Sequence, residues 1–283
     1  FRKQLGTGFC RKLLYKNGRR YVKLIEQPVP ARFYRSPEQV MRLARMGCSH
    51  PTRLSFLRQL LRRLKKENWS FDRPVWQINQ QGVGHAVYRA QGPERCYCLV
   101  AFAHDLPEEM RSDRVIATAW DATFTLFDGT PSAADIKRLE RNVPLQEAGR
   151  ISAKELSLSR ANRSVRLFEY VVKELAQGRQ PERSLLEQTG YLMRTTAVYG
   201  TGKFGAADRS TLVGRPEMQA PFQAEMLSVW LTRAFTRDLV EHLAAEQGGM
   251  QAVKLDPTLR RLLGVGNSTG LGMAPFLVRH PVL

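Results

Sequence analysis

Cysteine is scarce in this chain of 283 residues, which contains only Cys10, Cys48, Cys96 and Cys98. A small secreted protein held together by disulfides would be shorter and much denser in cysteine. Cys96 and Cys98 belong to a run typical of a strand, where alternate residues lie on the same face, and cysteines placed in this way rarely pair with each other. We therefore expect reduced, mostly buried thiols.

Long apolar runs are also missing. No segment approaches the roughly eighteen consecutive apolar residues that a membrane-spanning helix requires. The sequence lacks the pattern of a secretory signal peptide as well. These absences predict a cytoplasmic protein without a membrane partner. The chain begins at Phe1 instead of a methionine and ends on the apolar Leu283, so we expect a piece of a longer polypeptide.

Motifs that would assign a metal or a hydrolase mechanism are absent too. None of the five histidines belongs to an H-E-x-x-H motif, and Cys48 and His50 have no further ligand at a typical spacing. There is no G-x-S-x-G nucleophile elbow. The sequence therefore predicts no metal site and leaves any cofactor unidentified.

Acidic residues are few in the first quarter of the chain. Residues 1–75 contain nineteen Lys and Arg but only four Asp and Glu, whereas residues 76–283 contain twenty-five and twenty-two. Most of the formal net charge of +18 therefore lies in the N-terminal region, and the rest of the chain is close to neutral. Such a basic region attracts nucleic acid or an acidic protein partner.

The hydrophobic pattern predicts an α+β fold. A turn at residues 16–18 separates two strand-like runs and predicts a β-hairpin, which two helices at residues 36–46 and 52–67 follow. Alternating apolar and polar residues then predict a central antiparallel β-meander. Its three strands are expected at residues 85–90, 96–103 and 114–127.

The C-terminal half is predicted to be mainly helical, from apolar residues at helical spacing and from capping signals. The expected helices cover residues 132–142, a segment from Ala153 or Ser159 to Ala176, and residues 181–193, 221–246 and 256–263. We divide the chain into a basic hairpin and helix pair (1–75) and a body (76–283). The body consists of a sheet (83–128) and a helical part (130–283).

Two glycine-rich segments interrupt the helical half. The first, at residues 200–205, matches G-x-G-x-x-G, but no amphipathic helix follows it, so a dinucleotide-binding fold is not indicated. The second, at residues 264–272, surrounds an Asn-Ser-Thr core with glycines. Glycine-rich backbone approaches phosphate closely, and structural loops are the alternative. The predicted ligand-binding residues are Gly200, Gly202, Lys203, Gly205, Asp208, Arg209, Asn267, Ser268, Thr269 and Gly270.

Arginines gather at the expected start of the helix that ends at Ala176. Arg160 and Arg163 are candidates for bidentate binding of a carboxylate or phosphate. The alternative is a solvated helix face, on which Arg166 and Lys173 pair with Glu169 and Glu174. The two arginines therefore complete the predicted anion site, with the structural alternative left open.

Three polar residues flank the predicted strands. His104 and Asp105 follow the strand at residues 96–103, where a polar side chain reaches the rim of a pocket and serves as an acid or base. Asp121 lies on the threonine-rich face of the next strand. These three are the predicted catalytic residues, although each also fits an ordinary structural role.

The sequence leaves two hypotheses open. In the first, the protein is an enzyme or enzyme-like protein that binds a small anionic ligand, phosphorylated or of nucleotide type, between the two glycine-rich segments. In the second, it binds nucleic acid through its basic N-terminal region. The residues expected to contact nucleic acid are Lys12, Arg19, Arg20, Arg58, Arg62, Lys65 and Lys66.

Overall fold

The computed structural model describes residues 9–16, 19–26, 62–110, 119–145, 148–195, 214–215, 221–260 and 262–267. The chain forms two compact units, residues 1–40 and residues 41–283. The helix predicted at residues 36–46 lies outside the described residues, as does most of the one predicted at residues 52–67. Its last turn, residues 62–66, is helical.

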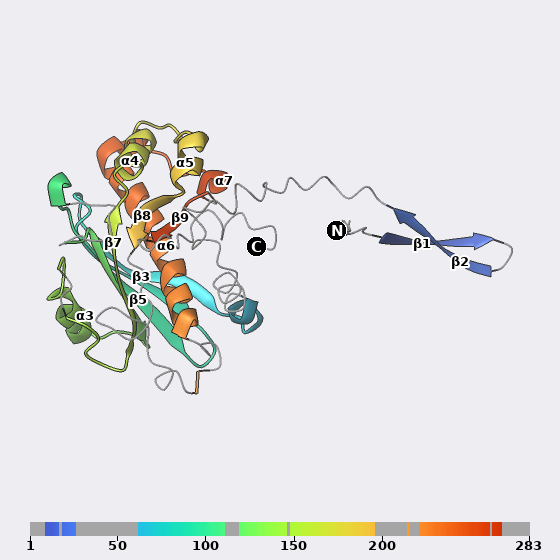
Figure 1. The fold of residues 1–283 in the computed structure, drawn as a ribbon, viewed down its shortest axis with the longest axis horizontal. Coiled ribbons are helices and arrows are strands. Elements are labelled where there is room, and N and C mark those ends of the chain that lie inside the picture. The colour runs from blue at the N-terminus through green and yellow to red at the C-terminus, as the bar shows by residue number, and fades with distance from the viewer. Residues whose placement is uncertain are drawn as a thin grey trace, which may run out of the picture. The chain divides into compact units, whose positions relative to one another are not determined.

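The first unit contains a β-hairpin. Strand β1 (Phe9–Lys16) pairs with β2 (Arg19–Glu26) in an antiparallel register that runs from Phe9 opposite Glu26 to Lys16 opposite Arg19 (Figure 1). Only two residues separate the strands, one of them a glycine, as in the tight turns that close hairpins. The predicted hairpin is confirmed.

The second unit is built on one sheet whose strand order follows the sequence. Neighbouring strands are antiparallel from the first to the sixth, and the last pair is parallel. The α+β fold and its antiparallel meander are thereby confirmed. The strands are β3 (Ser70–Ile78), β4 (Gly84–Gln91), β5 (Cys96–Ala103), β6 (Ala122–Asp128), β7 (Glu155–Arg163), β8 (Tyr191–Thr195) and β9 (Gly264–Asn267).

The sheet is larger than the predicted 83–128. The predicted strands at residues 85–90 and 96–103 are β4 and β5, and the third begins later than expected, at Ala122. Strand β3 precedes the predicted sheet, and the proposed domain boundary at residue 75 falls inside it. The last residues of the basic N-terminal region therefore belong to the sheet.

The helix predicted from Ala153 or Ser159 is wrong in its first half. Residues 155–163 form β7, which pairs with β6 so that Phe124 lies opposite Ser159 and Ala122 opposite Ala161. The apolar residues that suggested one helix, such as Ala161 and Phe168, thus belong to two elements, and only α4 (Phe168–Ala176) is helical. Val165, between the two elements, is 56% exposed.

The segment predicted as a helix at residues 181–193 also divides into two elements. Helix α5 (Arg183–Thr189) ends at Gly190, whose φ of 74° is in the left-handed region that favours glycine. Strand β8 begins at the next residue. The helix prediction was therefore correct only up to the glycine.

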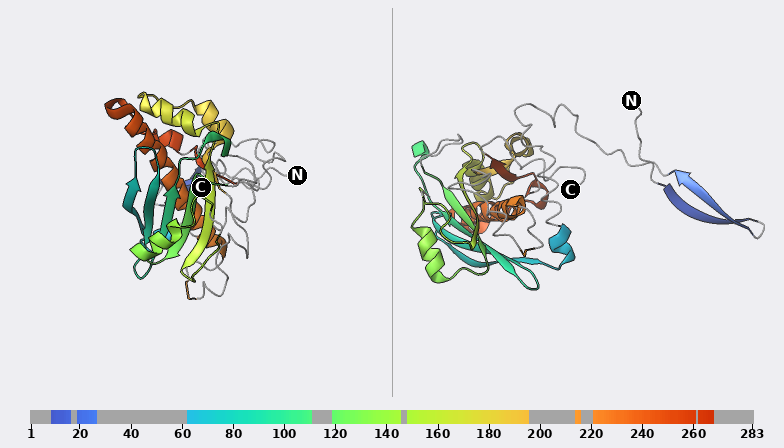
Figure 2. Two further views of the ribbon diagram at one scale, coloured as in Figure 1. Left: turned by 90° about the vertical axis from the view of Figure 1, so that its left-hand side faces the viewer. Right: turned by 60° about the horizontal axis from the view of Figure 1, so that its bottom comes forward.

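Two helices cover opposite faces of the sheet. Helix α6 (Pro221–Gly248), the long helix predicted at residues 221–246, contacts β4 to β9, and the sheet curls around it (Figure 2). Helix α3 (Ala133–Glu140) packs its Leu139 against the other face. Ser132 caps the N-terminus of α3 as predicted, and with Asp135 it forms a capping box. Short helix α7 (Pro257–Arg260) precedes β9.

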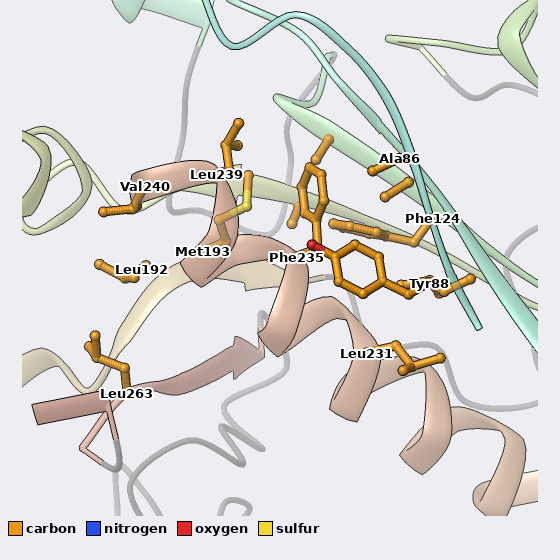
Figure 3. Packing of buried hydrophobic residues seen from close by; sticks show 14 of the residues in the cluster. Ala86, Tyr88, Phe124, Leu192, Met193, Leu231, Phe235, Leu239, Val240 and Leu263 are labelled. Atoms are coloured by element: carbon orange, nitrogen blue, oxygen red, sulfur yellow. The ribbon is translucent and has the colours of Figure 1, made fainter. Parts of the chain in front are cut away.

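The main hydrophobic core lies between α6 and the sheet. Phe235 of α6 is fully buried, and its ring centroid lies 5.5 Å from that of Phe124 and 6.3 Å from that of Tyr88 (Figure 3). Aliphatic side chains of α6, such as Leu231 and Leu239, extend this contact along the helix. Among the described helices, none has an apolar stretch of the length that a lipid bilayer requires.

Candidate functional site

The structure brings together the three residues predicted to be catalytic. His104 and Asp105 directly follow β5, and Asp121 directly precedes β6. The backbone N–H of His104 donates to the backbone carbonyl of Asp121 over 2.7 Å. Arg163, predicted as a ligand residue, joins the group because its Nη1 lies 3.5 Å from Asp105 Oδ1. Three predicted catalytic residues and one predicted ligand-binding residue thus form one cluster, at one end of the inner strands β5, β6 and β7.

Within this cluster, Asp121 ties β6 to β7. Its side chain is fully buried, and its Oδ2 accepts a hydrogen bond of 2.8 Å from the backbone N–H of Arg163. In return, the backbone N–H of Asp121 donates to Asn162 Oδ1 over 3.0 Å. Reciprocal bonds of this kind satisfy buried polar groups and fix the strand pair. The arrangement accounts for Asp121 structurally, and its catalytic role stays a prediction.

His104 is neutral in the environment that the structure describes. Its Nε2 is buried and has no hydrogen-bond partner among the described residues. Burial lowers the pKa of His104, and the attraction of its cation to Asp121 and Glu140 only partly offsets this. A neutral imidazole is the form that acts as a base.

The predicted arginine pair lies on a strand instead of a helix. Arg160 stacks over Trp120, with its guanidinium carbon 3.3 Å from the ring centroid, and burial lowers its pKa to about 10. The alternative pairing of Arg166 and Lys173 is wrong. Glu169 lies 3.5 Å from Arg163, and Glu174 receives two hydrogen bonds from Arg179.

The glycine-rich segments lie mostly outside the described residues. Of their predicted ligand residues only Asn267 is described, and it ends β9, so residues 264–267 form a strand instead of a loop. Asn267 lies opposite Thr195, the last residue of the parallel strand β8. The parallel strands β8 and β9 therefore end at the same edge of the sheet, the kind of position where parallel strands often hold a ligand. The site between them stays a prediction.

The predicted nucleic-acid residues are divided between the two units. Lys12, Arg19 and Arg20 belong to the hairpin, whereas Arg58 lies outside the described residues. In the helical turn at residues 62–66, Leu64 is buried against the core. Arg62, Lys65 and Lys66 are exposed on the same turn. The expected separation of apolar and basic faces is therefore present in this last turn.

A pocket that was not predicted lies between α6 and the first two strands of the sheet, and we call it the α6 pocket. Its volume is about 470 Å³. Phe71 of β3, Tyr88 of β4 and Trp230 of α6 supply aromatic surface, and Leu231 and Ala234 extend the apolar lining. A register shift between Asp72 and Val75 marks a β-bulge, a feature that is frequent beside binding sites.

An aspartate on α6 joins the pocket to the sheet. Asp238 Oδ2 accepts hydrogen bonds from the Tyr88 hydroxyl (2.6 Å) and from Arg73 Nη1 (2.8 Å). Burial raises the pKa of Tyr88, and the nearby charge of Asp238 raises it further. Tyr88 therefore keeps its proton and remains a donor to Asp238.

Arg233 is held by main-chain carbonyls. Its Nε donates to the carbonyl of Leu263 over 2.6 Å, and its Nη2 donates to the carbonyl of Arg260 over 3.0 Å. Burial and the neighbouring charge of Arg237 lower the pKa of Arg233 to about 10. These bonds fix the guanidinium in the pocket wall without neutralising its charge.

Arg237 differs from the other pocket arginines because it forms no hydrogen bond or ion pair with another residue in the described part of the chain. Its Nε is buried and lacks a partner. Burial lowers the pKa of Arg237 and repulsion from Arg260 lowers it further, while attraction to Asp238 and Glu241 only partly offsets this. A largely desolvated guanidinium without hydrogen bonds is unfavourable, and a carboxylate or phosphate satisfies it with paired bonds.

One signal of this pocket was present in the sequence. Trp230, Arg233, Ala234, Arg237 and Asp238 recur at spacings of three and four residues, so they share one face of a helix. On that face, arginines stand among the apolar residues that otherwise dominate α6. The strand residues opposite it are far away in the sequence and gave no comparable signal.

Within the described part of the chain, no three His, Cys, Asp or Glu side chains gather into a group that would hold a metal ion. No family model, curated protein or solved structure matches this chain.

Proposed function

We propose that the body of this protein binds a small anionic ligand in the α6 pocket, with Arg237 as its principal charge partner. The observation that carries the proposal is the largely buried Arg237 guanidinium, which has no hydrogen-bonding or ion-pairing partner among the described residues. The ligand class is the one expected from the sequence, but the described residues that line this pocket belong to neither glycine-rich segment.

The balance of charge around the pocket favours the binding of an anionic ligand. Two carboxylates line the pocket, and each is already paired with an arginine: Asp72 with Arg89, by bonds of 3.0 and 2.6 Å, and Asp238 with Arg73. The positive charges of Arg233 and Arg237 remain. The pocket volume of about 470 Å³ is within the range common for small-molecule sites, roughly 300–1,000 Å³.

A ligand panel tests this proposal on the whole chain. We expect aromatic carboxylates or nucleoside monophosphates to raise the melting temperature, while the matched neutral amides and nucleosides leave it unchanged. The variant Arg237→Gln should lose about 1.5–3 kcal/mol of binding free energy, or 10- to 100-fold in Kd, because a charged hydrogen bond is removed. Isothermal titration calorimetry measures the Kd directly.

The control is Arg179→Gln, which makes the same chemical change at an exposed arginine paired with Glu174. It should bind the ligand as the wild type does. Equal affinity of wild type and Arg237→Gln for every anion that binds would exclude this pocket as the anion site.

The hairpin supports a second function, the binding of nucleic acid. The β1–β2 register places Lys12 opposite Lys23 and Lys16 opposite Arg19. Like charges at directly opposed positions of an antiparallel pair are unfavourable, and a polyanion relieves them. The two strands contain six Lys and Arg and a single acid, Glu26.

This second function predicts a strong salt dependence. Fluorescence anisotropy with a labelled duplex and a labelled single strand should give an affinity that falls steeply between about 50 and 200 mM salt. The double variant Lys12→Gln/Lys23→Gln should reduce the slope of log K against log salt by about one per lost phosphate contact. Lys254→Gln, on the body, is the matched control. An affinity that does not change with salt would exclude this mode of binding.

A further inference from the structure

We infer that the ligand of the α6 pocket is a ring-bearing anion whose body also carries a hydrogen-bond donor, which Asp238 recognises. This inference rests on the proposed function and narrows the class of ligand. It follows from three features of the pocket: its size, its exposed aromatic lining and the hydrogen bonds of Asp238.

The size of the pocket argues against a bare inorganic anion. A water molecule takes up roughly 30 Å³ in the liquid, and phosphate has only five heavy atoms. An ion of that size would fill a minor part of the 470 Å³ and would leave the aromatic lining in contact with water. The ligand therefore has a body beyond its anionic group.

The aromatic lining indicates that this body is a ring. Phe71 is 43% exposed, and in strands β3 to β8 it is the only large hydrophobic residue exposed to that degree. Phe71 and the half-buried Trp230 line the pocket from opposite elements, β3 and α6. Aromatic side chains pack well against a flat ring in offset or edge-to-face geometry. A ring bound there covers apolar surface that is otherwise exposed.

The hydrogen bonds of Asp238 indicate the donor. Both Tyr88 and Arg73 donate to Oδ2, whereas Oδ1 accepts no hydrogen bond from a described residue. The side chain of Asp238 is 29% exposed and lines the pocket directly after Arg237 in the chain. When the anionic group of a ligand binds Arg237, the ring of the ligand lies near Asp238 Oδ1. A hydroxyl or amino group on that ring can donate a hydrogen bond to this oxygen.

Two classes of small molecule share this chemistry: hydroxylated aromatic acids and nucleoside monophosphates. Calorimetry on the whole chain separates them with two sets of probes. The first set is 4-hydroxybenzoate, benzoate and 4-hydroxybenzamide; the second is uridine monophosphate, uridine and inorganic phosphate. In at least one set, we expect the compound with ring, anion and donor to bind about 10- to 100-fold more tightly than each compound that lacks one of them.

The variants Asp238→Asn and Tyr88→Phe connect this preference to Asp238. Asp238→Asn should weaken the complete compound about 10-fold or more and bring it close to its donor-free analogue. Tyr88→Phe keeps the Asp238 carboxylate and should retain the preference. Thermal melting confirms that both variants are folded.

The outcomes separate this inference from the proposed function. If benzoate binds as tightly as 4-hydroxybenzoate, and phosphate as tightly as uridine monophosphate, while Arg237→Gln abolishes both, the anion site stands and the ligand class is wrong. A preference that survives in Asp238→Asn also overturns the inference. If none of the six compounds binds, the inference fails, and the broader panel described above decides the proposed function.

Discussion

Replacing Asp121 by alanine is expected to lower the free energy of unfolding by about 3–5 kcal/mol, the usual cost of removing one partner from a buried ion pair. Asp121 is fully buried, and its Oδ2 accepts the backbone N–H of Arg163. The Arg163 guanidinium, itself only 6% exposed, lies 3.9 Å from Oδ1. Alanine removes both the acceptor of the Arg163 backbone N–H and the negative charge beside the Arg163 guanidinium. Because the position is fully buried, solvent water does not replace them.

Urea denaturation of matched variants measures this effect. Asp121→Asn keeps an acceptor for the backbone N–H but loses the charge, so its stability should lie between those of alanine and wild type. The control Asp72→Ala breaks the solvent-exposed pair with Arg89 and should cost no more than about 1 kcal/mol. If Asp121→Ala unfolds at the same urea concentration as Asp72→Ala, the structural account of Asp121 is wrong and its predicted catalytic role becomes the better explanation.

Elements with local sequence signals could be predicted. The hairpin follows from a two-residue turn containing glycine, and α3 follows from Ser132 with Asp135 three residues later. Helix α6 was recognisable from its length and from the glycines at its end. In each case the signal lies within a few residues of the element that it specifies.

Strands whose partners are distant in the sequence were missed. Residues 155–163 begin with Glu155, which the sequence alone assigns to a helix as readily as to a strand. In the fold, Glu155 is buried and pairs with Arg138 of α3 over 2.6 Å, while the strand pairs with β6. Strand β9 is similar, because its glycines have no strand propensity and its pairing with β8 decides the structure.

The candidate site was predictable only in part. His104, Asp105 and Asp121 were each predicted to be catalytic, but Asp121 was expected inside a strand at residues 114–127. Strand β6 begins later, at Ala122, so Asp121 lies at its start, and its backbone carbonyl accepts the N–H of His104. The α6 pocket combines residues about 150 positions apart, such as Tyr88 and Asp238. The spacing of the arginines along α6 can be read from the sequence, but it indicates a pocket only once β3 and β4 are known to lie opposite it.

Phe235→Ala should be about as destabilising as Asp121→Ala, but through packing. The Phe235 ring is fully buried and contacts aromatic rings from three strands, with centroids 5.5 Å from Phe124, 6.2 Å from Trp76 and 6.3 Å from Tyr88. Truncation to alanine leaves a cavity between α6 and the sheet and should cost about 3–5 kcal/mol.

Phe235→Leu retains most of the volume and should cost clearly less, about 1–1.5 kcal/mol. Urea titration followed by tryptophan fluorescence measures both variants, since Trp76 lies beside the altered ring. Leu185→Ala, at a side chain that is 36% exposed, serves as the control and should cost at most about 1 kcal/mol. Because Tyr88 also donates to Asp238, loosening its packing should weaken anion binding in Phe235→Ala even where the protein remains folded. Equal stability of the alanine and leucine variants would mean that this aromatic contact does not hold α6 against the sheet.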